Sequence, residues 1–181
     1  MNSRLLPFLL LLSISCVACQ SSQGTSNSRT STTTTTQSGT SAQQIVTNSL
    51  PPTQTYDLQV NKDSIVARLT QVSFADDSII VTMAITNGSN NAIQLNAQND
   101  MFLTDNVYDR NQYNLSVPPD NPTIQVQPGT TMKGRFVFIG RLAPQASKLS
   151  LSMNYKSYSD RNPSRPYLYF NDILVQRHIQ K

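Results

Sequence analysis

From about residue 56 onward, the chain alternates short apolar runs with clusters of turn-forming residues. The clearest run places apolar side chains on one side of an extended segment, namely Ile79, Val81, Met83 and Ile85. This period-two alternation predicts a strand with one buried face. The preceding run, Ile65–Phe74, also predicts a strand, and its phase slips near Gln71, which predicts a β-bulge.

Further strands are predicted over residues 92–96, 101–104, 107–117, 123–127, 132–138, 149–155 and 167–175. Turn signals separate them at Asp76-Asp77, Asn87-Gly88, Pro118-Pro119 and Pro128-Gly129. Strands that recur every 8–12 residues or so are typical of a β-sandwich of immunoglobulin type. The sequence therefore predicts an all-β fold, with an immunoglobulin-like domain over residues 56–181 that is large enough to bury a core without disulfides.

Several segments follow one another in a characteristic order: the Asn87-Gly88-Ser89 turn, Phe102-Leu103-Thr104-Asp105, a proline-rich loop, Pro128-Gly129, and Gly134-Arg135-Phe136-Val137-Phe138. This order resembles a group of bacterial immunoglobulin-like domains found in exported lipoproteins. The likeness covers roughly residues 58–175. It implies the fold and an extracytoplasmic setting. It implies no active-site residues, since most members of the group have no known function.

The amino terminus follows the plan of a secretory signal peptide over residues 1–18. Arg4 supplies the positive charge, and an apolar stretch of about 14 residues follows it. A membrane-spanning helix needs roughly 20 apolar residues, so this stretch is too short for an anchor.

Small residues lead directly into Cys19, and the chain then turns polar at Gln20. This pattern resembles the lipobox of bacterial lipoproteins, in which the thiol of a cysteine receives diacylglycerol before the signal is removed. Cys16 is the alternative site, and Cys19 is favoured because the polar stretch starts just after it. The resemblance implies acylation, such as by palmitate, and anchoring to a membrane. In a Gram-negative host it implies the outer membrane, because Gln20 replaces the Asp that typically retains such proteins in the inner membrane.

Residues 19–55 are predicted to be the lipidated cysteine followed by a Ser/Thr-rich linker. The segment 30–39 is low in complexity, and the linker has almost no apolar side chains to bury. Such a segment cannot repay the entropy of ordering and is expected to be disordered. A flexible coil of about 36 residues spans roughly 33 Å, so the linker would let the domain search a volume above its membrane.

Composition narrows the choice of partners. Charged residues make up only 13% of the chain, and every acidic residue is Asp. Charge is unevenly distributed along the chain: the formal net charge is −5 over residues 57–132 and +7 over residues 133–181. We expect the fold to dilute this asymmetry by placing acidic and basic strands side by side, because no run of consecutive basic residues concentrates positive charge at one place. Nucleic-acid binding is not expected.

Catalytic and metal sites find little support in the sequence. The only histidine is His178, close to the carboxyl terminus, and no cysteine follows Cys19. Nucleophilic catalysis and zinc sites need more of these residues. A calcium site among Asn99-Asp100, Asp105, Asn106 and Asp109 matches no known loop spacing. We therefore expect a protein that is not an enzyme and has no cofactor and no metal; a hydrolase is the remote alternative.

The loop between the last two strands holds the candidate contact surface. Tyrosine and arginine are enriched at interface hot spots, and this loop supplies Tyr158, Arg161, Arg165 and Tyr167. The alternative is a hairpin tip whose tyrosines only pack on the rim of the sandwich. The leading functional hypothesis is a membrane-anchored module that binds a protein or an envelope polymer. The second is an accessory that supports assembly of an envelope complex.

Overall fold

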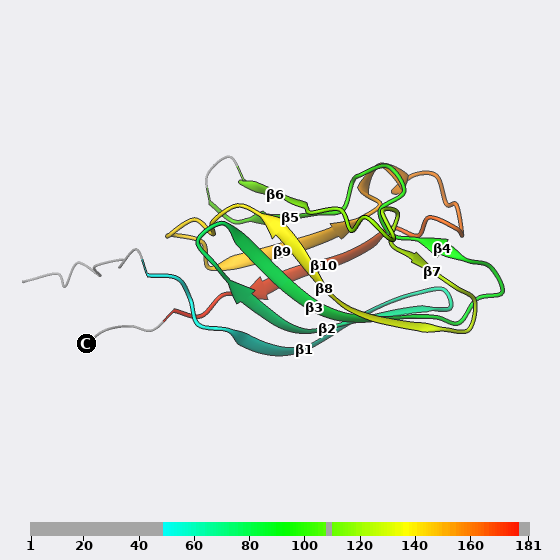
Figure 1. Ribbon diagram of the computed structural model, residues 1–181, viewed down its shortest axis with the longest axis horizontal. Coiled ribbons are helices and arrows are strands. Elements are labelled where there is room, and N and C mark those ends of the chain that lie inside the picture. Colours follow the sequence, from blue (N-terminus) through cyan, green and yellow to red (C-terminus); the bar gives the residue numbers. More distant parts are fainter. Residues whose placement is uncertain (1–48, 108–109, 178–181) are drawn as a thin grey trace, which may run out of the picture. The chain divides into compact units, whose positions relative to one another are not determined.

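The computed structural model describes residues 49–107 and 110–177, and Figure 1 shows how they are arranged. The predicted signal peptide over residues 1–18, both candidate lipidation sites, Cys16 and Cys19, and the linker up to residue 48 lie outside the described residues. Asp109 and His178 lie outside them as well. The predictions for these positions therefore stay predictions from sequence. Within the described residues, no helix is long and apolar enough to cross a membrane.

The described residues form ten strands and one short 3-10 helix. Eight strands make one antiparallel sheet in the order β1-β2-β3-β8-β6-β5-β9-β10, and the short strands β4 and β7 pair separately. The elements are β1 Gln54–Lys62, β2 Ile65–Phe74, β3 Ser78–Asn87, β4 Ile93–Gln94, β5 Phe102–Asp105, β6 Gln112–Leu115, β7 Gln125–Val126, β8 Thr131–Ile139, β9 Lys148–Met153, η1 Tyr155–Ser157 and β10 Leu168–Leu174.

The predicted alternation of β3 is confirmed, because its apolar series is buried and lies against the core, namely Ile79, Val81, Met83 and Ile85. The predicted bulge is confirmed too. The pairing of β2 with β3 shifts its register between Leu69 and Gln71, which lets the strand bend without losing its inward face. Both features follow from the local order of apolar and polar residues.

β1 is a strand that the sequence pattern above does not single out. It begins at Gln54 and alternates half-buried with exposed positions. Tyr56, Leu58 and Val60 pack against the core from this strand. Only half-buried residues face inward here, so the hydrophobic signal is weaker than in β2 or β3.

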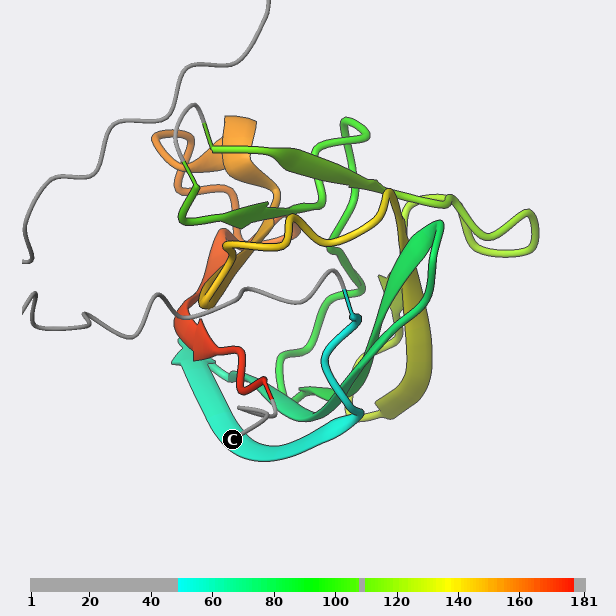
Figure 2. The ribbon, with the colours of Figure 1, turned by 90° about the vertical axis from the view of Figure 1, so that its left-hand side faces the viewer.

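The eight-stranded sheet folds over on itself around one core. β1, β2, β3 and β8 form one half, and the other half begins where β6 pairs with β8 through Leu115 and Phe138. Side chains from both halves fill the interior, among them Leu69, Phe138, Leu103 and Leu151, all fully buried. The all-β prediction is confirmed. The two halves face each other as in a sandwich, and the sheet nearly closes into a barrel (Figure 2).

The outer strands β1 and β10 meet along a seam that side chains bridge. The Tyr56 hydroxyl donates to the Leu174 carbonyl at 2.7 Å. Gln54 and Gln176 exchange two hydrogen bonds, both 2.9 Å long: the Gln54 amide donates to the Gln176 carbonyl, and the Gln176 N–H donates back. A ladder of main-chain bonds is not what joins β1 to β10, because the two strands are the ends of the hydrogen-bonded order.

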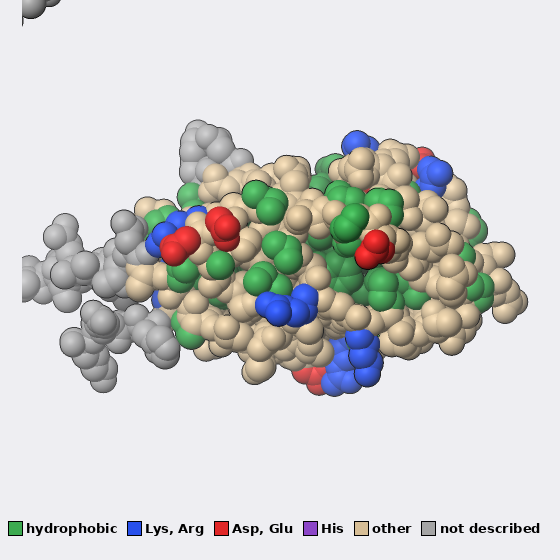
Figure 3. Space-filling model, in the orientation of Figure 1, with side chains coloured by type: hydrophobic (Ala, Val, Ile, Leu, Met, Phe, Trp, Pro, Cys, Tyr) green, Lys and Arg blue, Asp and Glu red, His purple; other side chains and the backbone are tan. Residues whose placement is uncertain are grey.

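Charges from the two parts of the sequence are mixed in space. Asp76, from the acidic first part, forms an ion pair with Arg141 from the basic second part. β3 and β8 come from different parts and lie side by side. Figure 3 shows the face on which these two strands lie nearest the viewer, and basic and acidic side chains stand next to each other there. The fold thus dilutes the asymmetry of the sequence, as expected.

Candidate binding surface

The loop from β9 to β10 is held by one buried asparagine. Asn154 follows β9, is fully buried, and has the left-handed backbone conformation (φ 54°). Its side-chain amide donates to the carbonyls of Gln94, at 2.6 Å, and Pro166, at 3.0 Å, and its oxygen accepts the Ala97 N–H at 3.0 Å. Asparagine tolerates the left-handed region because its short polar side chain bonds locally. Asn154 therefore ends β9 and ties both ends of the loop to the end of β4 and the residues that follow it.

A second buried residue fixes the short helix η1. One carboxylate oxygen of Asp100, which is 4% exposed, accepts the Lys156 N–H at 2.7 Å. The Lys156 ammonium also donates to the Gln98 carbonyl at 3.3 Å. The Gln94 N–H donates to the Ser164 carbonyl at 2.9 Å. These long-range bonds hold the 155–166 loop against residues 94–100, so its side chains project from a fixed base.

The fixed loop and the strands beside it present five aromatic side chains, which we call the tyrosine cluster: Phe102 on β5, Tyr155, Tyr158 and Tyr167 between β9 and β10, and Tyr169 on β10. Tyr167 is its centre. Its ring lies 5.1 Å from that of Tyr158 at an angle of 90°, and 6.4 Å from that of Tyr155 at 67°. The Tyr169 ring is nearly parallel to it at 6.2 Å. Edge-to-face and offset pairs of this kind stabilise each other beyond the area they bury.

Three rings of the cluster remain open to solvent. Tyr158 is 73% exposed, Tyr155 55% and Tyr169 40%. Ser152 faces the same side of the sheet as Phe102 and Tyr169, its partners in neighbouring strands, but it is only 5% exposed. The cluster therefore covers the outer side of β9 and leaves ring surface free above it.

The central tyrosine is neutral at physiological pH. Burial raises the pKa of the Tyr167 hydroxyl, and a hydrogen bond with the Ser152 side chain acts in the opposite direction. A neutral hydroxyl can both donate and accept a hydrogen bond. The cluster therefore offers aromatic faces and polar edges together.

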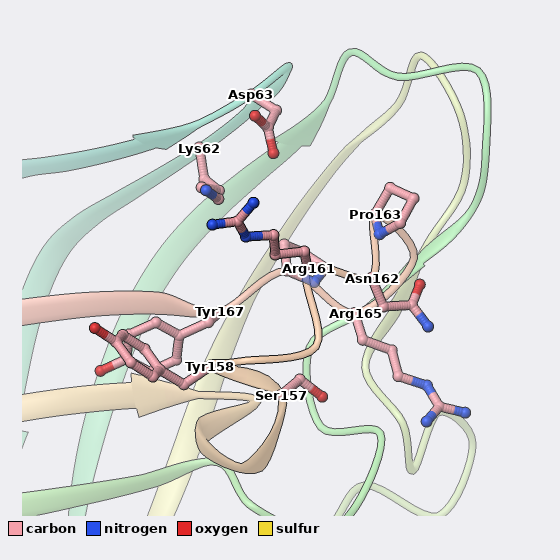
Figure 4. A pocket seen from close by; sticks show the side chains of 10 residues that line it. Lys62, Asp63, Ser157, Tyr158, Arg161, Asn162, Pro163, Arg165 and Tyr167 are labelled. Atoms are coloured by element: carbon pink, nitrogen blue, oxygen red, sulfur yellow. The ribbon is translucent and has the colours of Figure 1, made fainter.

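A hollow of about 480 Å³ adjoins the cluster and shares Tyr158 and Tyr167 with it; we call it the loop hollow. Its charged lining residues are Arg161 and Arg165 from the loop, Lys62 from the end of β1, and Asp63 from the turn that follows β1. Figure 4 shows the Arg161 guanidinium directed toward the side where Lys62 and Asp63 lie. It also shows the rings of Tyr158 and Tyr167 close together.

All four residues predicted as a contact surface line the loop hollow. The side chains of Tyr158, Tyr167 and Arg161 lie on one side of the loop, whereas the Arg165 side chain extends away from that of Arg161 toward the other side (Figure 4). The structure therefore brings three of the four together and directs the fourth elsewhere. Whether they contact a ligand stays a prediction.

Sequence reasoning did not connect Phe102, Tyr169, Lys62 and Asp63 to this surface. Tyr169 could have been found, because it is two residues from Tyr167 and shares a strand face with it. Phe102 joins only because β5 pairs with β9. Lys62 and Asp63 come from a hairpin about 100 residues earlier in the chain, and no local pattern connects them to the loop.

The residues considered above as a calcium site hold different parts of the structure through separate hydrogen bonds. Asp105 accepts hydrogen bonds from the Tyr113 hydroxyl at 2.8 Å, the Asn111 amide and the Val107 N–H. Asn106 accepts from the N–H groups of residues 147 and 148, and Asp100 holds η1. Within the part of the chain that the structure describes, no group of three or more His, Cys, Asp or Glu residues is placed to hold a metal ion.

No family model and no curated protein matches the chain. Among solved structures, it is similar to a functionally unknown protein from Listeria monocytogenes, with 11% identity and a TM-score of 0.46 over 70% of this chain and 84% of that one. A candidate lipoprotein from Bacillus subtilis has 14% identity and a TM-score of 0.43, covering 65% and 39%. An uncharacterised β-sandwich protein from Clostridium difficile has 12% identity and a TM-score of 0.39, covering 64% and 89%. At these scores the likenesses carry no argument about function.

Proposed function

We propose that the chain is an extracytoplasmic lipoprotein whose β domain binds a ligand without transforming it. The tyrosine cluster carries this proposal. Exposed apolar side chains that gather in one patch mark an interaction site, whereas single ones need no explanation. Tyr158 is 73% exposed, and Tyr155 and Tyr169 are exposed beside it around Tyr167. Buried Asn154 and Asp100 fix the loop that carries Tyr158 in place. A rigid, exposed aromatic surface loses little conformational entropy on binding.

The proposed location rests on the amino-terminal pattern. A short apolar leader, small residues and Cys19 match the order in which lipoprotein precursors are processed. Two or more acyl chains anchor a protein stably, whereas one binds only marginally. The expected site is the envelope membrane, and in a Gram-negative host the outer membrane.

The anchor is tested by labelling cells with an alkyne analogue of palmitate and comparing Cys19→Ser with Cys16→Ser. Loss of label in Cys19→Ser alone is the expected result, together with a mature amino terminus at Cys19 by mass spectrometry. Unlabelled wild-type protein with its leader intact would show that the chain is not a lipoprotein.

Binding is tested by sedimenting the detergent-solubilised full chain with envelope fragments of the host. Tyr158→Ala is expected to reduce the sedimented fraction. Ile139→Ala is the matched control, because Ile139 is 58% exposed but lies on β8, in the other half of the sheet. Equal retention of wild type and Tyr158→Ala would refute a binding role for the tyrosine cluster.

A further inference from the structure

We propose that the tyrosine cluster and the loop hollow together bind a polysaccharide that carries carboxylate groups. This inference rests on the proposed function and names the class of ligand for the same surface. Three properties of the surface support it: the geometry of the rings, the kind of side chain around them, and the charge of the hollow.

The rings offer faces on which sugars can stack. Tyr158 meets Tyr167 at 90° and Tyr155 meets it at 67°, so neither exposed ring is stacked face to face against the central one. The C–H groups on one side of a pyranose pack against such a face, where the ring is electron-rich. The rings of Tyr158, Tyr155 and Tyr169 each lie 5.1–6.4 Å from that of Tyr167, so three exposed rings gather around one centre. The cluster can therefore contact more than one sugar of a chain.

The surroundings of the rings favour a sugar over a protein partner. Protein interfaces place aliphatic and aromatic side chains together in a dry centre. The exposed large hydrophobic residues in this cluster are all tyrosines, whereas the exposed aliphatic ones lie elsewhere: Val117 and Ile139 on or beside other strands, and Leu174 at the opposite end of β10 from Tyr169. Polar groups adjoin the rings instead: the Tyr169 hydroxyl donates to Asn171, which Ser150 also contacts. Aromatic faces bordered by hydroxyl and amide groups suit a ligand rich in hydroxyls.

The charge of the loop hollow selects for an acidic polysaccharide. Lys62 and Arg161 line it together with the single carboxylate of Asp63, whereas the side chain of Arg165, which also lines the hollow, extends away from Arg161 (Figure 4). Neither Lys62 nor Arg161 forms an ion pair with another of the described residues. A guanidinium such as that of Arg161 binds a carboxylate through two parallel hydrogen bonds. The hollow therefore has positive charge to spare beside the rings.

A buried hydroxyl in the wall of the hollow adds a further polar group. Ser157 is 3% exposed, and its Oγ makes no hydrogen bond with any described residue. A buried polar atom without a partner costs free energy. A hydroxyl or carboxylate of a ligand in the hollow can supply that partner once the Ser157 side chain turns toward it, whereas an apolar group cannot.

The test uses the detergent-solubilised full chain and four preparations of the host envelope. One is untreated, one is digested with protease, one is oxidised with periodate to cleave sugar diols, and one has its uronic carboxyls reduced with carbodiimide and borohydride. Retention is expected to survive protease and to be lost after periodate. Reduction of the carboxyls is expected to weaken it about fivefold at low salt and much less at high salt, because salt screens the charge term.

Two pairs of variants make the test specific. Tyr158→Ala is expected to weaken retention about tenfold, with Ile139→Ala as its control. Arg161→Gln is expected to reduce the difference between untreated and carboxyl-reduced envelope, because Lys62 remains in the hollow. Arg135→Gln is its control, since Arg135 is also exposed but lies on β8.

The outcomes separate this inference from the proposed function. Retention that depends on Tyr158 but is removed by protease and resists periodate would overturn the polysaccharide and leave a protein ligand. Periodate-sensitive retention that ignores carboxyl reduction and Arg161→Gln would overturn the acidic character of the ligand. Retention that never depends on Tyr158 would overturn both proposals.

Discussion

Asn154 is the residue whose replacement should most disturb the binding surface. Its side chain makes three hydrogen bonds to main-chain groups of residues 94, 97 and 166, and it is fully buried. Alanine would leave these groups without their partner. At about 1 kcal/mol for each net hydrogen bond, the loss comes to about 3 kcal/mol.

The backbone adds a second term. Asn154 has φ 54°, and alanine in the left-handed region costs about 1 kcal/mol more than asparagine or glycine. Asn154→Ala should therefore destabilise the domain by about 4 kcal/mol, a large part of the 5–15 kcal/mol or so that holds a typical domain together. Asn154→Gly should cost about 1 kcal/mol less than Asn154→Ala, because it loses the same bonds without the strain.

Urea unfolding of the full chain measures both effects. With an m-value of about 1.5 kcal/mol per molar, Asn154→Ala should lower the midpoint by roughly 2.5 M. Near-UV circular dichroism should lose tyrosine signal in the same variant, since η1 and the tyrosine cluster depend on this anchor. A midpoint shift below about 0.7 M, or equal shifts for alanine and glycine, would refute the reasoning.

Three further predictions concern other parts of the fold. Burial and the Asp105 hydrogen bond raise the pKa of Tyr113 to about 12, so the contribution of this group to stability is complete below about pH 10 and is lost as the pH rises toward 12. Tyr113→Phe should therefore flatten the fall of the urea midpoint over this pH window, and an unchanged slope would contradict the assignment. Gly140→Ala should destabilise the domain by about 2 kcal/mol or more, because φ is 125° and a Cβ would lie 2.8 Å from the Tyr113 ring. Gly134→Ala is the control, because its Cβ would meet nothing closer than 3.7 Å, and it should leave the thermal melt nearly unchanged. Gln54→Ala removes both hydrogen bonds to Gln176 and should speed amide exchange in β10 near the seam, while exchange in β3 stays unchanged.

The strands and turns of this protein follow from its sequence. The alternation of Ile79, Val81, Met83 and Ile85 is a period-two signal that any half-buried strand must show. The bulge near Gln71 appears as a slip of that period. Residues 118–122 lie between β6 and β7, as their prolines predicted. All three signals are local, so they can be interpreted without knowing which strands pair.

The ends of the short strands were harder to predict from sequence. Residues 107–117 were expected to form one strand, but among the described residues of this stretch only Gln112–Leu115 form a strand, β6. The predicted last residue of β9, Tyr155, lies instead in η1, because Asn154 turns the chain through its left-handed conformation. Propensity alone did not reveal that turn, since two of the three partners of Asn154, Gln94 and Ala97, lie about 60 residues away in the chain.

The sequence by itself determined the all-β class, the principal turns and the loop that carries Tyr158, Arg161 and Tyr167, because each is written in neighbouring residues. Only the tertiary structure decided that Phe102 joins these tyrosines, that Lys62 and Asp63 complete the hollow, and that Arg165 extends away from Arg161. These relations depend on the order of strands in the sheet. That order is set by long-range packing around a shared core, which a periodic pattern in one segment does not encode.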